Sequence, residues 1–177
     1  MELQELLLQR RSCRSYKNEK VLKEDVEEII KSALLAPSWK NSQTGRYYVA
    51  LSDEAINVVK DSLPEFNQNN SKNAAYIVAC YKKGDSGYSV TINDFTDEYK
   101  DSWGAYDLGL QNSYLLLKAK ELGYDTLIMG MRDEEKLRKY FNIPEDQAIL
   151  PVIAIGKADK EMTLRPRKEV CEVLNIK

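Results

Sequence analysis

The chain has 177 residues, a formal net charge of -2 and 43% apolar residues, which suits one domain with its own core and excludes both disorder and a generally basic surface for nucleic acid. It contains no histidine, which excludes Ser-His-Asp triads, Cys-His dyads and the usual histidine-containing zinc sites. If the protein is an enzyme, its chemistry is expected to come from a bound cofactor.

The first quarter of the sequence predicts two helices and a strand. Residues 2–11 form a short helical pattern with leucines on one face. Residues 23–36 carry an apolar stripe that ends where Pro37 disfavours further helix. After a polar loop at 38–45, aromatic and branched residues at 47–51 predict a strand.

The next segments predict a capped helix, a buried strand and a loop. Asp53 is placed to cap a helix over 53–63, which Pro64 ends. Residues 75–81 are continuously apolar and predict a buried strand. Residues 82–96 show no periodic pattern and are expected to form a loop.

Residues 98–122 predict the longest helix of the chain. Its middle part, 103–117, has apolar residues on nearly every face, and such a helix must be covered on all sides. Either part of it packs against another subunit or it is a central helix of the core, and both interpretations remain open. Gly123 is expected to cap its end.

The last part of the chain predicts two strands around a charged helix. The strands lie at 125–130 and 148–155, and Asp133 is placed to cap a helix that ends near Phe141. Helices that alternate with about four apolar strands predict a layered α/β or α+β fold. No repeat or linker divides residues 1–177, so a single domain is expected.

The three cysteines, Cys13, Cys80 and Cys171, are isolated from one another and form no metal-binding or disulfide pattern. Cys13 is interpreted as a packing residue, although its arginine neighbours would favour a reactive thiolate. Residues 1–5 are acidic and polar, unlike a signal peptide, and no stretch reaches the roughly 20 apolar residues of a membrane span. A cytoplasmic protein without a membrane partner is expected.

Two basic clusters lie at opposite ends of the chain: Arg10, Arg11 and Arg14 near the start, and Arg165, Arg167 and Lys168 near the end. Together they have the chemistry of a phosphate clamp, because a guanidinium group donates paired hydrogen bonds to phosphate oxygens. Ser12 adds a further donor in the first cluster. On spacing alone, two solvated charge runs are the simpler alternative.

The loop after Pro37 is dense in neutral hydrogen-bonding groups and includes Trp39. Amides satisfy both donors and acceptors on a planar heterocycle, and an indole ring stacks on one. An ordinary polar loop with a half-buried tryptophan is the alternative. The acidic residues at 94–98 lack metal-ligand spacing, so no metal site is predicted.

Taken in order, these segments resemble the nitroreductase family of FMN-dependent oxidoreductases. The similarity rests on RRSCRSY at 10–16, APSWKNSQ at 36–43, the stretch 106–130, and IGK at 155–157 followed by RPRK at 165–168. The resemblance implies a mixed central sheet flanked by helices. It also implies an intertwined homodimer with two FMN sites at the interface.

The same resemblance implies which residues contact FMN. Those expected at the phosphate, the ribityl chain and the pyrimidine edge are Arg10, Arg11, Ser12, Arg14, Arg165 and Arg167. Those expected from the loop of the partner subunit are Pro37, Ser38, Trp39, Asn41 and Gln43. Asn67 and Asn70 are expected to face the pyrimidine, and Met129 and Gly130 to offer backbone groups near flavin N5 and O4.

The implied activity is ping-pong hydride transfer. NADH or NADPH reduces FMN, and a nitroaromatic, a quinone or a free flavin then accepts the electrons. No catalytic side chain is expected, and Arg14 is the candidate for stabilising the negative charge of the reduced ring. An FMN-binding storage or sensing protein without efficient turnover is the alternative, and nucleic-acid binding is disfavoured by the acidic net charge.

Three departures from the family pattern bear on the acceptor. Trp39 stands where a second serine is common, and Asn70 is neutral where some members have lysine. The segment 82–96 is short where larger members carry helices that cover the substrate. The physiological acceptor is therefore left open.

Overall fold

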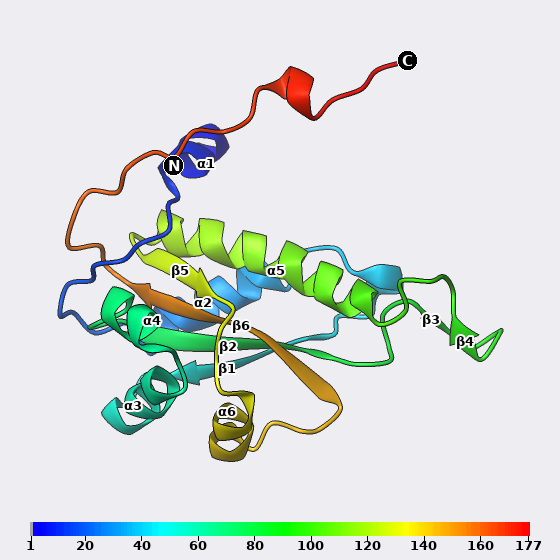
Figure 1. Cartoon of the computed structure of the whole chain (residues 1–177), viewed down its shortest axis with the longest axis horizontal. Coiled ribbons are helices and arrows are strands. Elements are labelled where there is room, and N and C mark those ends of the chain that lie inside the picture. The colour runs from blue at the N-terminus through cyan, green and yellow to red at the C-terminus, as the bar shows by residue number, and fades with distance from the viewer. Residues whose placement is uncertain (1) are drawn as a thin grey trace.

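A four-stranded sheet with the strand order β1-β2-β6-β5 lies between two layers of helices (Figure 1). The computed structural model describes residues 2–177. The strands are β1 (Gly45–Ala50), β2 (Ala75–Lys82), β5 (Asp125–Met129) and β6 (Gln147–Gly156). Neighbouring strands in this sheet are antiparallel.

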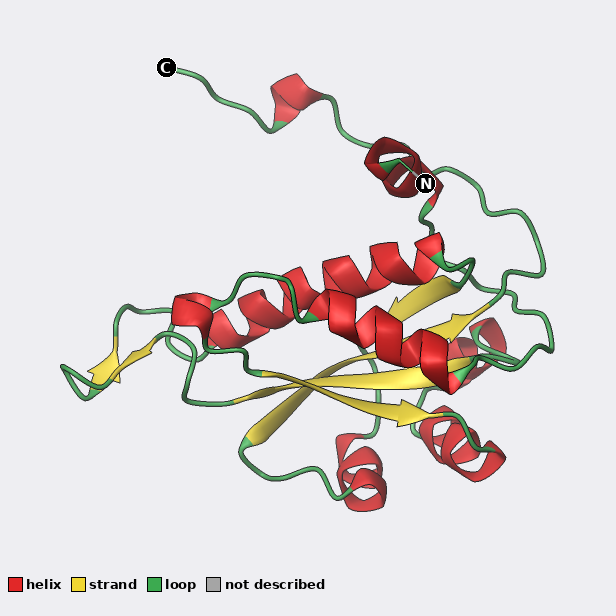
Figure 2. Ribbon diagram, turned by 180° about the vertical axis from the view of Figure 1, so that it is seen from behind, coloured by secondary structure: helices red, strands yellow, loops and turns green. Residues whose placement is uncertain are grey.

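The helices cover both faces of the sheet, with α2 and α5 on one face and α3 and α6 on the other (Figures 1 and 2). Their bounds are α1 (Leu3–Gln9), α2 (Lys23–Ala33), α3 (Asp53–Asp61), α4 (Glu65–Asn70), α5 (Ser102–Glu121) and α6 (Glu134–Phe141). Short 3₁₀ turns lie at Trp39–Asn41 and Val170–Glu172. The predicted layered fold of helices and strands is confirmed.

The core consists of two apolar layers, one on each face of the sheet. Ile77 of β2 belongs to the layer under α2 and α5, where Leu108 and Leu115 are fully buried. Its neighbour Val78 belongs to the opposite layer, where Leu137 of α6 is fully buried. Successive residues of a strand point to opposite faces, so a strand covered on both faces is apolar throughout.

The predicted mixed sheet has very little parallel pairing. Within residues 2–177, the one parallel bridge joins Ser12 to Thr126 at the outer edge of β5. The bridge places the segment after α1 beside the sheet, so the N-terminal basic cluster lies next to the start of β5.

One prediction about local structure between β1 and β2 needs correction. Asp53 is not the cap of α3, because the hydroxyl of Ser52 accepts the capping hydrogen bond from the Ala55 amide at 3.2 Å. Asp53 lies in the first turn, where its negative charge interacts favourably with the positive end of the helix dipole. Pro64 follows α3 as expected, but it also begins α4, so the amide-rich tract at 67–70 is helical.

The sequence predicted a loop at 82–96, and this prediction is incomplete. The segment contains a small hairpin of β3 (Tyr88–Ser89) and β4 (Asp94–Phe95) that projects from the body of the molecule beside the start of α5 (Figure 1). The rings of Tyr88 and Phe95 meet edge to face at 5.6 Å across the hairpin. Such a short hairpin has no periodic sequence pattern long enough to be recognised.

Helix α5 is exposed along one side. It begins at Ser102 rather than near residue 98, and Gly123 follows its end with a φ of 82°, as a glycine cap does. Tyr106 and Tyr114 are 59% and 43% exposed. The interpretation of this helix as a central helix of the core, covered on all sides by its own chain, is therefore wrong. Packing against a second subunit stays a prediction. In the described part of the chain, no helix combines the length and apolar character needed to cross a membrane.

Replacing Gly104 with alanine is expected to lower the free energy of unfolding by about 1–3 kcal/mol. A Cβ atom at this position of α5 would clash with the ring of the buried Tyr81. At Gly109, an added Cβ meets no atom within 4 Å. Gly109→Ala is therefore the control for a clash within the chain, and its free energy of unfolding is expected to fall less than that of Gly104→Ala, because the new Cβ meets no atom of its own chain and alanine favours helix. Urea unfolding tests both variants, and equal destabilisation would contradict this packing.

Candidate cofactor-binding site

Backbone hydrogen bonds hold the segment after α1 against the sheet and the C-terminal tail. The Cys13 amide donates to the Thr126 carbonyl at 2.9 Å, and the Lys17 amide donates to the Lys157 carbonyl at 2.9 Å. Cys13 is only 1% exposed. Because the segment is anchored in this way, the arginines next to Cys13 lie near the tail that follows β6.

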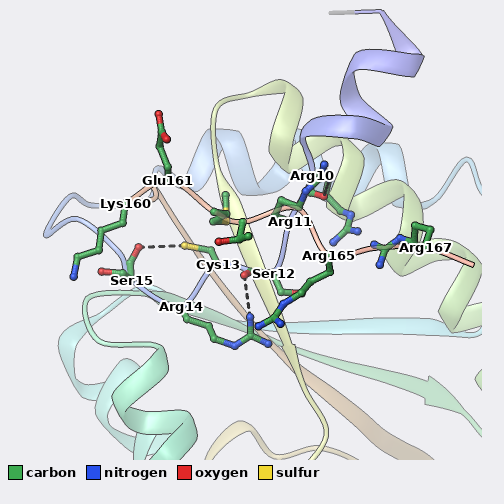
Figure 3. Close-up of a pocket in the computed structure, with 12 residues that line it drawn as sticks. Arg10, Arg11, Ser12, Cys13, Arg14, Ser15, Lys160, Glu161, Arg165 and Arg167 are labelled. Carbon is green, nitrogen blue, oxygen red and sulfur yellow. Dashed lines mark hydrogen bonds between the residues drawn. The ribbon is translucent and has the colours of Figure 1, made fainter.

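The arginines of both basic clusters lie on the same cavity, of about 480 Å³, whereas Lys168 does not line it. This arginine cavity is lined by Arg10, Arg11, Ser12, Arg14, Arg165 and Arg167, together with Cys13, Ser15 and residues 160–163. Figure 3 shows the guanidinium groups of Arg14 and Arg165 directed toward the same space beside Ser12. The tertiary structure thus favours the predicted clamp over two separate charge runs.

The positive charge of the arginine cavity is not neutralised within the described residues, where none of its five arginines pairs with a carboxylate. The pKa of Arg10 is lowered, first by burial and then by the charges of Arg167 and Arg11. Glu161 also lines the cavity, but its carboxylate points away from the arginines (Figure 3). Such a cluster favours a bound anion that accepts several hydrogen bonds, as a phosphate does.

Cys13 lies in the arginine cavity, but its thiol is not activated. Burial is the main cause that raises the pKa of the thiol, and the Sγ atom donates to the Ser15 carbonyl at 3.2 Å. The interpretation of Cys13 as a packing residue is therefore favoured over a reactive thiolate.

The residues expected from the loop of a partner subunit, Pro37, Ser38, Trp39, Asn41 and Gln43, lie away from the arginine cavity of their own chain. The Trp39 amide donates to Asp107 Oδ2 at 3.0 Å, near the start of α5. The arginine cavity lies beside Thr126, just beyond the other end of that helix. The helix rises on the order of 20 Å between Asp107 and Glu121, so one chain does not bring the two groups together.

The backbone of this loop is strained. Lys40, Asn41 and Gln43 have φ values of 44°, 58° and 50°, in the left-handed region that residues other than glycine rarely adopt. Each costs about 1–3 kcal/mol and persists only where surrounding contacts fix it. One such contact is the hydrogen bond from the Gln43 amide to Ser38 Oγ at 3.0 Å.

The remaining predicted contacts also lie outside the arginine cavity. Asn67 is buried in α4, where its carbonyl accepts from Ser71 Oγ at 2.7 Å, and Asn70 is half-buried at the end of that helix. Met129 is buried at the end of β5. Gly130 lines a second, mostly apolar groove of about 430 Å³, which we call the α5 groove.

The α5 groove lies between α5 and the strands β5 and β6. It is lined by Ala105, Leu108, Gly109, Asn112, Ser113, Leu116, Ile128, Gly130, Arg132, Leu150 and Pro151. Two buried polar atoms in these side chains, Asn112 Oδ1 and Arg132 Nε, have no hydrogen-bond partner in the described chain. Buried polar atoms are rarely left unpaired in a native protein, which points to a ligand, a water molecule or a second chain in this groove.

Several residues of these sites are missing from the sequence prediction. Lys160 and Thr163 line the arginine cavity, and Asn112 and Arg132 line the α5 groove. No local motif marks them. Asp107 does carry a signal, because it is the only charged residue between positions 102 and 117 of an apolar helix.

Comparison with known proteins assigns the family. The family model described as "Nitroreductase family" matches residues 7–157. This range is most of the chain, so the protein belongs to the nitroreductase family of oxidoreductases, as the sequence motifs predicted.

Similar proteins match the chain over most of their own length. One from Archaeoglobus fulgidus, named "Putative NADH dehydrogenase/NAD(P)H nitroreductase", is 28% identical over 159 residues, which cover 88% of this chain and 84% of the relative. One from Bacillus subtilis, "Putative NAD(P)H nitroreductase YdgI", is 28% identical over 189 residues, with 90% of each chain covered.

A solved structure with the same fold comes from Exiguobacterium sibiricum and is described as "a putative nitroreductase in complex with FMN". It superposes with a TM-score of 0.89 at 23% sequence identity and covers 100% of this chain and 98% of that one. A nitroreductase family protein from Clostridium difficile has a TM-score of 0.80 at 23% identity, with 99% and 98% covered. These structures establish the nitroreductase fold for the chain.

Proposed function

We propose that the protein is an FMN-dependent oxidoreductase that uses NADH or NADPH. The observation that carries the proposal is the arginine cavity, where charges from both ends of the sequence converge and, within residues 2–177, none of the arginines pairs with a carboxylate. A flavin mononucleotide carries a phosphate that fits this donor set. The names of the relatives and the FMN in the Exiguobacterium structure agree with this assignment.

The arginine cavity would hold the phosphate end of FMN. Arg165 and Arg167 from the tail, together with Arg10 and Arg11, supply guanidinium donors to this cavity. Arg14, whose side chain extends beside Ser12, is proposed to stabilise negative charge on the pyrimidine edge of the ring.

When bound, FMN supplies the redox chemistry, because it takes a hydride from NAD(P)H and passes the electrons to a nitroaromatic, a quinone or a free flavin. The protein needs no side chain that acts as nucleophile or base, which fits the absence of histidine. Its own residues bind and orient the ring and stabilise the charge that forms on reduction.

The functional unit is proposed to be a homodimer with one FMN site at each end of the interface. The loop at 38–43 and the arginine cavity lie near opposite ends of α5, so antiparallel pairing of two such helices would bring each loop to the cavity of the other chain. The α5 groove offers an apolar surface for this pairing. Exposed leucines on α1 and apolar residues in the tail, including Leu7, Val173 and Ile176, offer further surface that a partner would cover.

The compartment is proposed to be the cytoplasm. The three cysteines of the chain are free thiols, two of them buried, which suits a reducing environment.

Initial rates test the proposed reaction. With NADH or NADPH varied at several fixed quinone concentrations, double-reciprocal plots are expected to give parallel lines, the pattern of a ping-pong reaction. Intersecting lines would contradict departure of the nucleotide before the acceptor binds. Negligible NAD(P)H oxidation by a protein that retains FMN tightly would instead support flavin storage or sensing.

A further inference from the structure

Asp107 is a buried carboxylate that ties two separate segments to α5. Its side chain is 2% exposed and makes no ion pair with any residue in the described range 2–177. The Oδ2 atom accepts from the Trp39 amide at 3.0 Å, from Ser42 Oγ at 3.4 Å and from Ser86 Oγ. Since a buried charge is costly unless it is hydrogen-bonded, these three donors explain how Asp107 is retained in an apolar helix.

The loop that Asp107 holds is the strained one. Two of its donors, Trp39 and Ser42, belong to the loop and flank the left-handed residues Lys40 and Asn41. A strained backbone persists where surrounding contacts over-determine it, and such strain concentrates at functional sites. Asp107 supplies that constraint from outside the loop.

The same carboxylate fixes an aromatic wall. The ring of Trp39 lies 5.0 Å from that of Trp103, which in turn meets Tyr106 edge to face at 5.6 Å. The Trp103 indole donates to Asp97 at 2.9 Å, whereas the buried indole nitrogen of Trp39 has no partner in the described chain. The Trp39 ring is therefore held by ring packing and by its backbone link to Asp107.

The base of the hairpin packs against Trp103 and also contacts Asp107. Gly87, with a φ of 83°, lies against Trp103 so closely that a Cβ there would be 2.7 Å from the indole ring. Ser86, the residue before it, is fully buried and donates to Asp107. The position of the Trp39 ring is thus set jointly by the loop, the hairpin base and α5.

We propose that Asp107 is a positioning residue that selects acceptors by holding Trp39 as a fixed wall over the flavin site of the partner subunit. The inference rests on the proposed function, in which the loop at 38–43 faces that site. A rigid indole leaves a flat slot, so the acceptors are planar aromatic oxidants such as unsubstituted quinones, and oxidants with bulky out-of-plane groups are excluded. Release of the loop from Asp107 widens the slot.

Two readouts test this role in the full-length FMN-loaded protein. Trp39 and Trp103 are the only tryptophans of the chain, so the near-ultraviolet circular dichroism of tryptophan reports on this pair alone. Asp107→Ala is expected to reduce that signal. The acceptor ratio, which is kcat/KM for unsubstituted naphthoquinone divided by kcat/KM for a naphthoquinone with a bulky substituent, is expected to fall by about tenfold. Asp107→Asn keeps one acceptor oxygen and is expected to have a smaller effect in the same direction. Because the ratio compares two acceptors on the same enzyme, a partial loss of FMN would cancel from it.

Asp94→Asn is the matched control, because Asp94 lies exposed in the hairpin and, among the described residues, its side chain accepts only from the next amide in the chain. It is expected to leave both readouts unchanged. A folded Asp107→Ala variant with an unaltered tryptophan signal or an unaltered acceptor ratio would overturn the proposal. If that variant does not fold, Asp107→Asn and Ser86→Ala decide by the same criteria. A wild-type protein that binds no FMN would refute the proposed function, whereas the tryptophan signal alone still shows whether Asp107 holds Trp39.

Discussion

Replacing Arg165 and Arg167 together with alanine is expected to weaken FMN binding by about 100-fold, without loss of the fold. Each hydrogen bond to a charged group contributes about 1.5–3 kcal/mol, and two lost phosphate contacts at the low end of this range, which suits exposed side chains, give about this factor. Both residues are exposed in the tail, where they support no part of the core. Titration of the apoprotein with FMN, followed by flavin fluorescence, measures the change.

Lys168→Ala is the matched control for this double substitution. Lys168 is also basic and exposed, and it directly follows Arg167, but it does not line the arginine cavity. Its dissociation constant for FMN is expected to lie within about twofold of the wild-type value, since the substitution removes only a long-range charge that salt screens. Unchanged affinity for FMN in the Arg165/Arg167 variant would show that the tail is not part of the binding site.

A glutamate in the α5 groove is expected to separate the dimer and to release FMN at the same time. Leu116 lines this groove and is only partly covered by its own chain. Leu116→Glu would place a carboxylate in an apolar interface, which costs several kcal/mol, and each chain would then lack the loop supplied by its partner. Analytical ultracentrifugation combined with flavin absorbance measures both quantities on one sample.

Leu22→Glu makes the same chemical change at a leucine that is 55% exposed and lies outside the α5 groove. This variant is expected to remain a dimer with full FMN occupancy. A Leu116→Glu protein that is a monomer and still carries a full complement of FMN would contradict the shared site.

The strands were the most predictable elements, because covering a sheet on both faces forces continuous apolar runs. All four predicted strands are present, with bounds within two residues of the prediction. The errors lie where a single hydrogen bond or a short turn decides the structure. Ser52 and Asp53 are equally good caps on composition, and only the geometry of the turn selects Ser52.

The candidate site was predictable where motifs are local and not where tertiary structure assembles it. The residue types of the two basic clusters indicated phosphate chemistry, and the family resemblance placed them in one site, but their spacing alone did not distinguish a shared cavity from two separate charge runs. The α5 groove has no sequence signature, since Asn112 and Arg132 come from different elements. Asp107 stood out in an apolar helix, yet its donors lie in a loop and a hairpin that periodicity does not reveal.

The visible absorption spectrum of the purified protein, recorded before and after anaerobic addition of NADH or NADPH, tests the central claim most directly. The expected result is a flavin spectrum that the nucleotide bleaches and that a quinone or a nitroaromatic restores. A colourless protein that takes up no added FMN would contradict the assignment of the arginine cavity as a flavin phosphate site.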